Sequence, residues 1–575
     1  MSVRRLSFLA VAVVSIIFWA ACGQVYRPVV IPCSTGGVPG CPVETNPSPA
    51  NFHAVLGISN NAPGYSGEAM QLDVAGDSVI GETSFSTGSA PNAGLNPTHA
   101  AMLPSDSRVY VATAGSAFPG GTDSIESFSP VFQSTQGTGF GAVSTLGLPS
   151  QSTSIVAISE AANVVTVTLG TALSNVVAGS AIVIGNQAVT GYNGTFAIVA
   201  ITGTTLQYVD TVTGLAPSSG GTASVPPQPV FVNSSQNTAM YVANYNTNSV
   251  SAINTASNVV VNSALVGTNP VSLAETPNGL KLYVANQGSN TVSSLNPVDM
   301  TANVVTGFTG VNPVWVVARG DSQKVYVLTE GDGQLVTIDV ATDTVTSSLP
   351  VGAGANFIFF DPNLNRLYIT NPVTGTVYVF SDTGPNDTPT QLAAISMTAG
   401  ANPPCKTACT PVSVTSLLDG SRFYVASYQT STTCPDSTVS GACVVPLLSV
   451  FDANSLTLKY PSAPSMTLLT WPPFATNQYA VLQQTYCATA PLYPALYSPG
   501  VPRFRMFTAA AADSSRVYVS ICDAGAIAIV NTTGANTNNS GSPLPPDTLV
   551  IDALTLQEAN STTALQPPIF LIMGQ

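Results

Sequence analysis

The chain has 575 residues, and only 7% of them are Asp, Glu, Lys or Arg, against about 25% in an ordinary soluble protein. Its 14 basic and 28 acidic residues give a formal net charge of -14 without a basic stripe, which excludes nucleic-acid binding and attraction to an anionic lipid surface. The 47 glycines and 44 prolines separate short runs rich in Val, Thr, Tyr and Ile, a pattern typical of an all-β protein.

Residues 1–21 are predicted to be a signal peptide, because Arg4 and Arg5 precede an apolar run that is too short to span a membrane. The segment from Trp19 to Cys22 resembles the lipobox of bacterial lipoproteins, although that family usually has Leu at the position of Trp19. The resemblance implies a lipid on Cys22 and an exported protein in the cell envelope, facing either the periplasm or the surface. The alternative is an ordinary secretory signal with an incidental cysteine.

Residues 22–50 are rich in proline and are expected to form a tether between the lipid and the folded part. Without Cys22, the nine cysteines leave eight, an even number that suits disulfides in an oxidising compartment. Cys33 and Cys41 could close a small loop within the tether. The other candidate disulfide cysteines are Cys405, Cys409, Cys434, Cys443, Cys487 and Cys522.

The rest of the chain contains a repeat centred on a tyrosine in a short apolar strand. The tyrosines are Tyr110, Tyr241, Tyr283, Tyr326, Tyr368, Tyr424 and Tyr518. From Tyr241 to Tyr368 the spacings are 42, 43 and 42 residues, which suits one four-stranded propeller blade per repeat. A polar turn-forming residue follows thirteen positions after the tyrosine, and a Gly-x-x-Pro element then leads into the next unit.

These repeats resemble the YVTN family of β-propeller repeats, most closely over residues 231–381. The resemblance implies an all-β propeller of seven or eight four-stranded blades. Its first blades are expected at residues 51–150 and the others at 226–575, with residues 54–80 as a degenerate first unit. That unit lacks a strand, and we expect the C-terminal residues 567–573 to supply it and to close the ring.

Four insertions interrupt the repeat, at residues 151–225, 398–411, 428–447 and 460–503. Each is expected after a second or fourth strand, and therefore on one face of the disc, while the turns on the other face are expected to stay short. Because a rigid scaffold positions its loops for binding, the elaborated face is the candidate binding face. The alternative is that surface loops simply tolerate insertion.

Residues 151–225 contain alternating strands of their own and are expected to form a small β-module. The segment from Gly191 to Phe196 is similar to modules of bacterial and phage surface proteins, which suggests adhesion. The longest propeller insertion gathers aromatic residues that could bind a glycan or a peptide, or could pack the loop onto its blade. They are Trp471, Phe474, Tyr479, Tyr486, Tyr493 and Tyr497.

No catalytic or metal-binding constellation is found in the sequence. His53 and His99 are the only histidines, and the carboxylates stand singly on turns. A thiolate metal site at Cys405 and Cys409, or a calcium site at residues 382–387, has little support. The leading hypothesis is a monomeric, noncatalytic extracytoplasmic scaffold that binds a protein, peptide or glycan without a cofactor and contacts the membrane only through its lipid. A propeller lactonase-like hydrolase and an envelope or adhesion protein are the alternatives.

Overall fold

The computed structural model describes residues 55–59, 67–73, 78–85, 94–117, 121–130, 143–384, 387–398, 404–405, 408–435, 440–462, 465–469, 480–481, 487, 505–533, 545–555 and 568–573. The predicted signal peptide, the tether, and Cys22, Cys33 and Cys41 lie outside these residues. Among the residues that are described, no helix is long and apolar enough to span a membrane.

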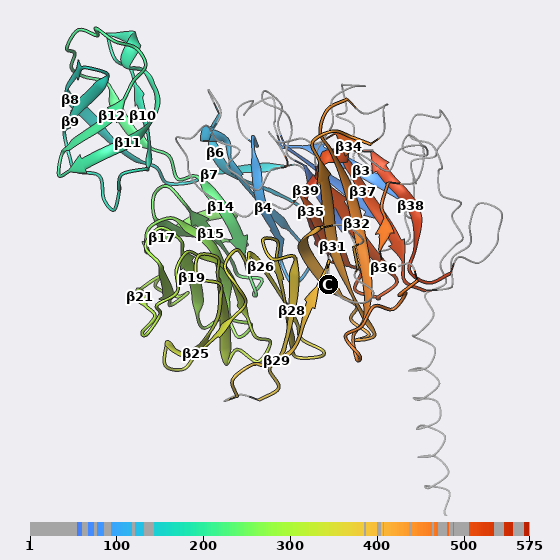
Figure 1. Ribbon diagram of the computed structural model, residues 1–575. Coiled ribbons are helices and arrows are strands. Elements are labelled where there is room, and N and C mark those ends of the chain that lie inside the picture. The colour runs from blue at the N-terminus through green and yellow to red at the C-terminus, as the bar shows by residue number, and fades with distance from the viewer. Residues whose placement is uncertain are drawn as a thin grey trace, which may run out of the picture.

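The propeller has eight blades, each a four-stranded antiparallel sheet (Figure 1). In order from the axis outwards, blade 1 comprises β39 (Pro568–Met573), β1 (Val55–Ser59), β2 (Glu68–Asp73) and β3 (Ser78–Ser84). Blade 2 comprises β4 (Pro97–Met102), β5 (Val109–Ala114), β6 (Asp123–Phe128) and β7 (Ser144–Gly147). Blade 3 comprises β14 (Pro229–Asn233), β15 (Ala239–Asn244), β16 (Ser249–Asn254) and β17 (Val259–Leu265). Blade 4 comprises β18 (Pro270–Glu275), β19 (Leu282–Asn286), β20 (Thr291–Leu295) and β21 (Ala302–Val304).

Blade 5 comprises β22 (Pro313–Ala318), β23 (Lys324–Thr329), β24 (Gln334–Asp339) and β25 (Thr344–Pro350). Blade 6 comprises β26 (Phe357–Asp361), β27 (Arg366–Asn371), β28 (Thr376–Ser381) and β29 (Thr390–Ser396). Blade 7 comprises β30 (Thr410–Ser416), β31 (Arg422–Ser431), β32 (Cys443–Asp452) and β33 (Met466–Thr467), and β34 (Ala480–Val481) also pairs with β32. Blade 8 comprises β35 (Met506–Ala510), β36 (Arg516–Ile521), β37 (Ala526–Asn531) and β38 (Thr548–Thr555).

The ring is closed by the two ends of the chain, as predicted from the sequence. The C-terminal β39 pairs antiparallel with β1, with Val55 opposite Met573 and Leu56 opposite Ile572. It is the innermost strand of blade 1, so the count is eight blades rather than seven. Closure pairs the edge that each terminal unit would otherwise expose.

The second strands form the interior because each lies between two neighbouring blades and is covered on both faces. All six residues of β5, β23 and β36 are buried, whereas the outer strand β17 is mostly exposed. Outer strands carry a β-bulge at a similar position in blades 3, 5 and 6. A bulge interrupts the regular row of backbone donors and acceptors, so these edges are poor templates for pairing with another chain.

The strand tyrosines also bind charged groups between blades. Tyr283 donates a hydrogen bond to Asp343 of the next blade over 2.5 Å, and Lys281 pairs with the same carboxylate over 2.7 Å. Tyr326 and Lys324 hold Asp382 in the same way, over 2.5 Å and 2.8 Å, and Tyr424 and Arg422 hold Asp547. We call each group of a tyrosine, a basic residue two positions before it and an aspartate of the next blade an inter-blade latch.

Asp382 therefore does not belong to a calcium site. Lys324 and Arg319 lie 2.8 Å and 3.1 Å from its carboxylate, which is fully buried. Two cations already neutralise the charge that calcium would need, so the calcium reading of residues 382–387 is wrong for this residue.

The two faces of the disc differ in their connections. The insertion face carries the connections that follow second and fourth strands, and the turn face carries those that follow first and third strands. Contrary to the sequence prediction, the turn face also has two long connections, residues 129–143 between β6 and β7 and residues 532–547 between β37 and β38. Lengthening a surface connection costs little free energy on either face. The short turns of the middle blades therefore did not predict the length of the third-to-fourth strand connections in blades 2 and 8.

The insertion after blade 2 is a closed six-stranded barrel that projects beside the propeller (Figure 1). Its strands are β8 (Gln151–Ala161), β9 (Val164–Leu169), β10 (Ala181–Gly185), β11 (Gly194–Thr202), β12 (Thr205–Val209) and β13 (Thr222–Val225). Alternate residues point inwards, among them Val165, Val167 and Tyr208, and they form a core separate from that of the blades.

Candidate binding face

The insertion face is the candidate site, and its predicted aromatic residues cannot be placed on it. Trp471, Phe474, Tyr479, Tyr486, Tyr493 and Tyr497 all lie outside the described residues. Within the predicted insertion 460–503, the structure describes β33 and β34, which both pair with β32. Part of that segment therefore completes blade 7 instead of standing above it.

Three disulfides brace the insertion face. They join Cys405 to Cys409, Cys434 to Cys443, and Cys487 to Cys522. The first lies between β29 and β30, the second spans the β31–β32 connection, and the third ties the segment before β35 to the end of β36. All three cross-link connections that follow second or fourth strands, whereas residues 129–143 and 532–547 of the turn face contain no cysteine. Because Cys405 and Cys409 are bonded to each other, they offer no thiolate pair to a metal.

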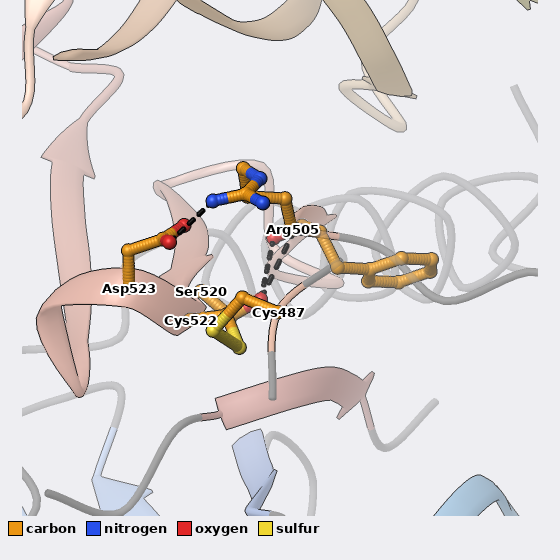
Figure 2. Close-up of a disulfide and its surroundings, with 6 residues drawn as sticks. Cys487, Arg505, Ser520, Cys522 and Asp523 are labelled. Carbon is orange, nitrogen blue, oxygen red and sulfur yellow. Dashed lines mark hydrogen bonds and ion pairs between the residues drawn. A yellow bond between two sulfur atoms is a disulfide. The ribbon is translucent and has the colours of Figure 1, made fainter. Parts of the chain in front are cut away.

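A buried ion pair lies beside the third disulfide (Figure 2). Arg505 precedes β35, and its guanidinium pairs with Asp523, the residue after Cys522. The guanidinium carbon also lies 5.2 Å from the ring centroid of Tyr428, which lies in β31, the second strand of blade 7. The Ser520 hydroxyl accepts a hydrogen bond from the Phe507 backbone N–H over 3.0 Å. The contact between Arg505 and Tyr428 therefore connects blade 8 to blade 7 at the insertion face.

The barrel is held to this face by amide side chains of blade 3. Asn246 accepts a hydrogen bond from the Ala181 N–H over 2.6 Å and donates to the Ala181 and Pro226 carbonyls over 3.0 Å and 2.8 Å. Asn248 donates to the Asn175 carbonyl. Both asparagines are buried, unlike the exposed Gly288 and Asn290 of the corresponding turn in blade 4. The turn of blade 3 thus fixes the barrel in one orientation.

The central channel is closed by six aromatic side chains from six first strands. Going round the axis, consecutive ring centroids are 3.7–5.8 Å apart, and the circuit returns to its start. The members of this channel cluster are His99, Phe231, Trp315, Phe357, Phe507 and Phe570. Ser272 and Ser413 occupy the equivalent positions in blades 4 and 7, where their small side chains let the flanking rings meet.

His99 is a packing residue in this cluster. It stacks on Phe231, and its Nδ1 accepts a hydrogen bond from the Val232 N–H over 3.5 Å. Burial lowers the pKa of His99 from 6.5 to about 3, so its imidazole is neutral near pH 7. Asp339, a carboxylate that a hydrolase could pair with this histidine, ends β24 on the turn face, where it accepts a hydrogen bond from the Thr342 N–H over 2.8 Å. The structure does not bring the two together.

One further buried acid lies in blade 2. Glu126 is fully buried in β6, and burial raises its pKa to about 6 although Ser124 and Thr145 each donate a hydrogen bond to it over 2.7 Å. Among the described residues, no group of three or more His, Cys, Asp and Glu side chains is placed to hold a metal ion.

Positive charge is distributed unequally between the faces. Of the lysines and arginines that the structure describes, Arg505 alone lies at the insertion face, and it is buried against Asp523. The others lie in or beside the first-to-second or third-to-fourth strand turns of the opposite face. They are Arg108, Lys281, Arg319, Lys324, Arg366, Arg422, Lys459 and Arg516. The described part of the insertion face therefore offers no exposed cation to an anionic ligand.

Two sequence signals for these features were missed. A basic residue stands two positions before most strand tyrosines, and at Lys281, Lys324 and Arg422 it belongs to a latch. A proline stands two positions before most channel positions, as in Pro97 before His99 and Pro313 before Trp315. Proline suits the first residue of a strand because it has no N–H to donate.

Comparison with known proteins assigns no family. No family model matches the chain, and no curated protein matches it. Among solved structures, it is similar to the periplasmic gluconolactonase of Pseudomonas aeruginosa, with 12% identity over 91% of this chain and 99% of the other and a TM-score of 0.43. It is also similar to hydrazine synthase of Kuenenia stuttgartiensis (14%, 56% and 87%, TM-score 0.37) and to dihydro-heme d1 dehydrogenase NirN (10%, 91% and 78%, TM-score 0.42). With TM-scores below 0.5, none of their properties is carried over to this chain.

Proposed function

We propose that this protein is a noncatalytic extracytoplasmic scaffold of the YVTN type, anchored through a lipid on Cys22, which binds a protein, peptide or glycan on its insertion face. The observation that carries the proposal is the bracing of that face. All three described disulfides, and the amide contacts that hold the barrel, are on the side where the connections are elaborated. Bracing keeps long loops in one conformation before a ligand arrives and so reduces the entropy lost on binding.

The channel supports a binding role rather than catalysis. In the described propeller, the axis is filled by the channel cluster, and its histidine is neutral, stacked on Phe231 and in contact with the tilted ring of Phe570. Disulfides favour a location outside the reducing cytoplasm, in agreement with the predicted signal peptide.

The proposal is tested with two variants of the insertion face and one control. In the first, a short Gly-Ser linker between β7 and β14 replaces the barrel, whose core is separate from that of the blades. In the second, the six aromatic residues of the 471–497 segment become alanine. The control lacks residues 534–544 of the turn face. Each is used for cross-linking capture from an envelope extract and for binding to arrays of peptides and uncharged glycans, after its unfolding transition has been compared with that of the parent.

We expect at least one insertion-face variant to lose the captured partner or the array signal and the control to keep both. Retention by both insertion-face variants would overturn the proposal. Lactone hydrolysis by the parent that disappears in His99→Phe would show that the protein is an enzyme instead.

A further inference from the structure

The point at which the chain enters the propeller is fixed by the pairing of β1. The first strand of every blade runs from the insertion face to the turn face, so Pro568 of β39 lies near the insertion face and Met573 near the turn face. Since β1 is antiparallel to β39 and Val55 is opposite Met573, the first residue of β1 lies at the turn face. Everything that precedes β1 therefore joins the propeller at the turn face.

The barrel and the disulfides are on the other side. The barrel follows β7, a fourth strand, and rests on Asn246 in the second-to-third strand turn of blade 3. Connections of both kinds belong to the insertion face. The chain therefore enters the propeller at the turn face, while the barrel and the disulfides lie at the insertion face.

We infer that the protein stands on its anchor with the turn face towards the membrane and presents the insertion face, with the barrel, away from it. This inference rests on the proposed lipid anchor at Cys22. It identifies the partner as a macromolecule of the surrounding compartment rather than a lipid of the anchoring membrane.

The tether favours this orientation. To bring the insertion face onto the bilayer, residues 22–54 would have to reverse direction where they leave β1 and run round the outside of the blade. The proline content of residues 24–50 predicts a stiff, extended tether, which would oppose such a reversal.

The orientation is measured by energy transfer on the full, lipidated chain in phosphatidylcholine vesicles whose headgroups carry an acceptor dye. A fluorescent amino acid replaces either Thr204, exposed in the β11–β12 turn of the barrel, or Val298, which is 88% exposed in a turn-face loop of blade 4. Neither residue belongs to a latch, a disulfide or the channel cluster. We expect more efficient transfer from position 298 than from position 204. Equal or reversed efficiencies would overturn the inference.

Vesicle flotation separates this test from that of the anchor. If the parent floats with the vesicles and Cys22→Ser does not, the proposed anchor is supported. If the parent does not float, the anchor at Cys22 fails, and the same two labels are measured on the chain bound through a histidine tag at position 22 to nickel-chelating lipids. The order of transfer efficiencies then decides the orientation in the same way, independently of lipidation.

Discussion

The two faces of this propeller are stabilised by different chemistry. On the turn face, neighbouring blades are joined by latches in which a buried aspartate accepts bonds from a tyrosine and a basic residue. On the insertion face, disulfides and asparagine amides hold the loops and the barrel. In a chain with so few charges, most of the described cations serve the turn face. The comparison shows that the latches between neighbouring blades lie on one side of the disc, while the braced loops and the barrel lie on the other.

The largest effect is expected from removing a latch. In Asp382→Ala, Lys324 stays buried without its counter-charge, Arg319 keeps only its pair with Asp321, and Tyr326 loses its acceptor. Breaking a buried pair in this way costs about 3–5 kcal/mol of unfolding free energy. The matched control is Asp339→Ala, which removes an exposed turn cap on the same face and costs about 1 kcal/mol. Urea unfolding that gave equal losses for the two variants would contradict the role of the latch.

Loss of a covalent brace should come next. Cys487→Ser combined with Cys522→Ser opens a cross-link between residues 35 positions apart, which the loop-entropy model values at about 4 kcal/mol before losses from local strain, so we expect about 2–4 kcal/mol. The corresponding change at Cys434 and Cys443, which are 9 positions apart, should cost less. Thermal unfolding of both double variants in the absence of reductant measures the difference. A larger loss at Cys434 and Cys443 would contradict this order.

The channel cluster gives a pH dependence. The pKa of His99 is about 3 in the folded protein and 6.5 in the unfolded chain, so the unfolded chain takes up the proton first and stability falls as the pH drops from 6.5 towards 3. The loss amounts to about 2 kcal/mol at pH 5. Glu126 acts in the opposite sense between pH 6 and 4.5, because its folded pKa is raised.

His99→Phe separates these contributions, because it keeps an aromatic ring in the cluster and removes the titrating group. Unfolding free energies of the parent and the variant are compared at pH 7 and pH 5. We expect the parent to lose about 2 kcal/mol more than the variant over this interval. Parallel pH profiles would show that His99 is not buried as the structure places it.

The repeat carried most of the information about the fold that could be predicted from sequence. Tyr241, Tyr283, Tyr326 and Tyr368 recur at nearly constant spacing because each fills the same buried position in a second strand. The closing strand was predictable for a related reason: a blade that lacks an inner strand must obtain one from the end of the chain. The channel cluster was not, because sequence spacing does not reveal which side chains meet at the axis of a ring.

The site was harder to predict than the fold. The even number of cysteines predicted disulfides, but sequence alone left their pairing open, and the structure joins Cys434 to Cys443 and Cys487 to Cys522. Asn246 carried no distinguishing signal, since asparagine is common in such turns for its own backbone preferences. Its role depends on a contact with Ala181, which lies 65 positions away and belongs to another folding unit.

The smallest effect is expected from removing the contact between Asn246 and Ala181. This change tests whether partner binding requires the barrel to be held in one orientation. Asn246→Ala removes one accepted and two donated hydrogen bonds at the barrel, while the neighbouring Asn248 still binds the Asn175 carbonyl. We expect the free energy that holds the barrel against blade 3 to fall by about 1–2 kcal/mol, while the unfolding free energy of the blades stays the same. Hydrogen exchange should rise at residues 175–181, and the amides of β23 should stay protected. Asn303→Ala, the same change at an exposed asparagine of the outer strand β21, is the matched control. If Asn246→Ala leaves hydrogen exchange at residues 175–181 unchanged, the segments that join the barrel to β7 and β14 hold it without this contact. If exchange rises and the variant still captures the partner, the partner does not require a fixed orientation of the barrel.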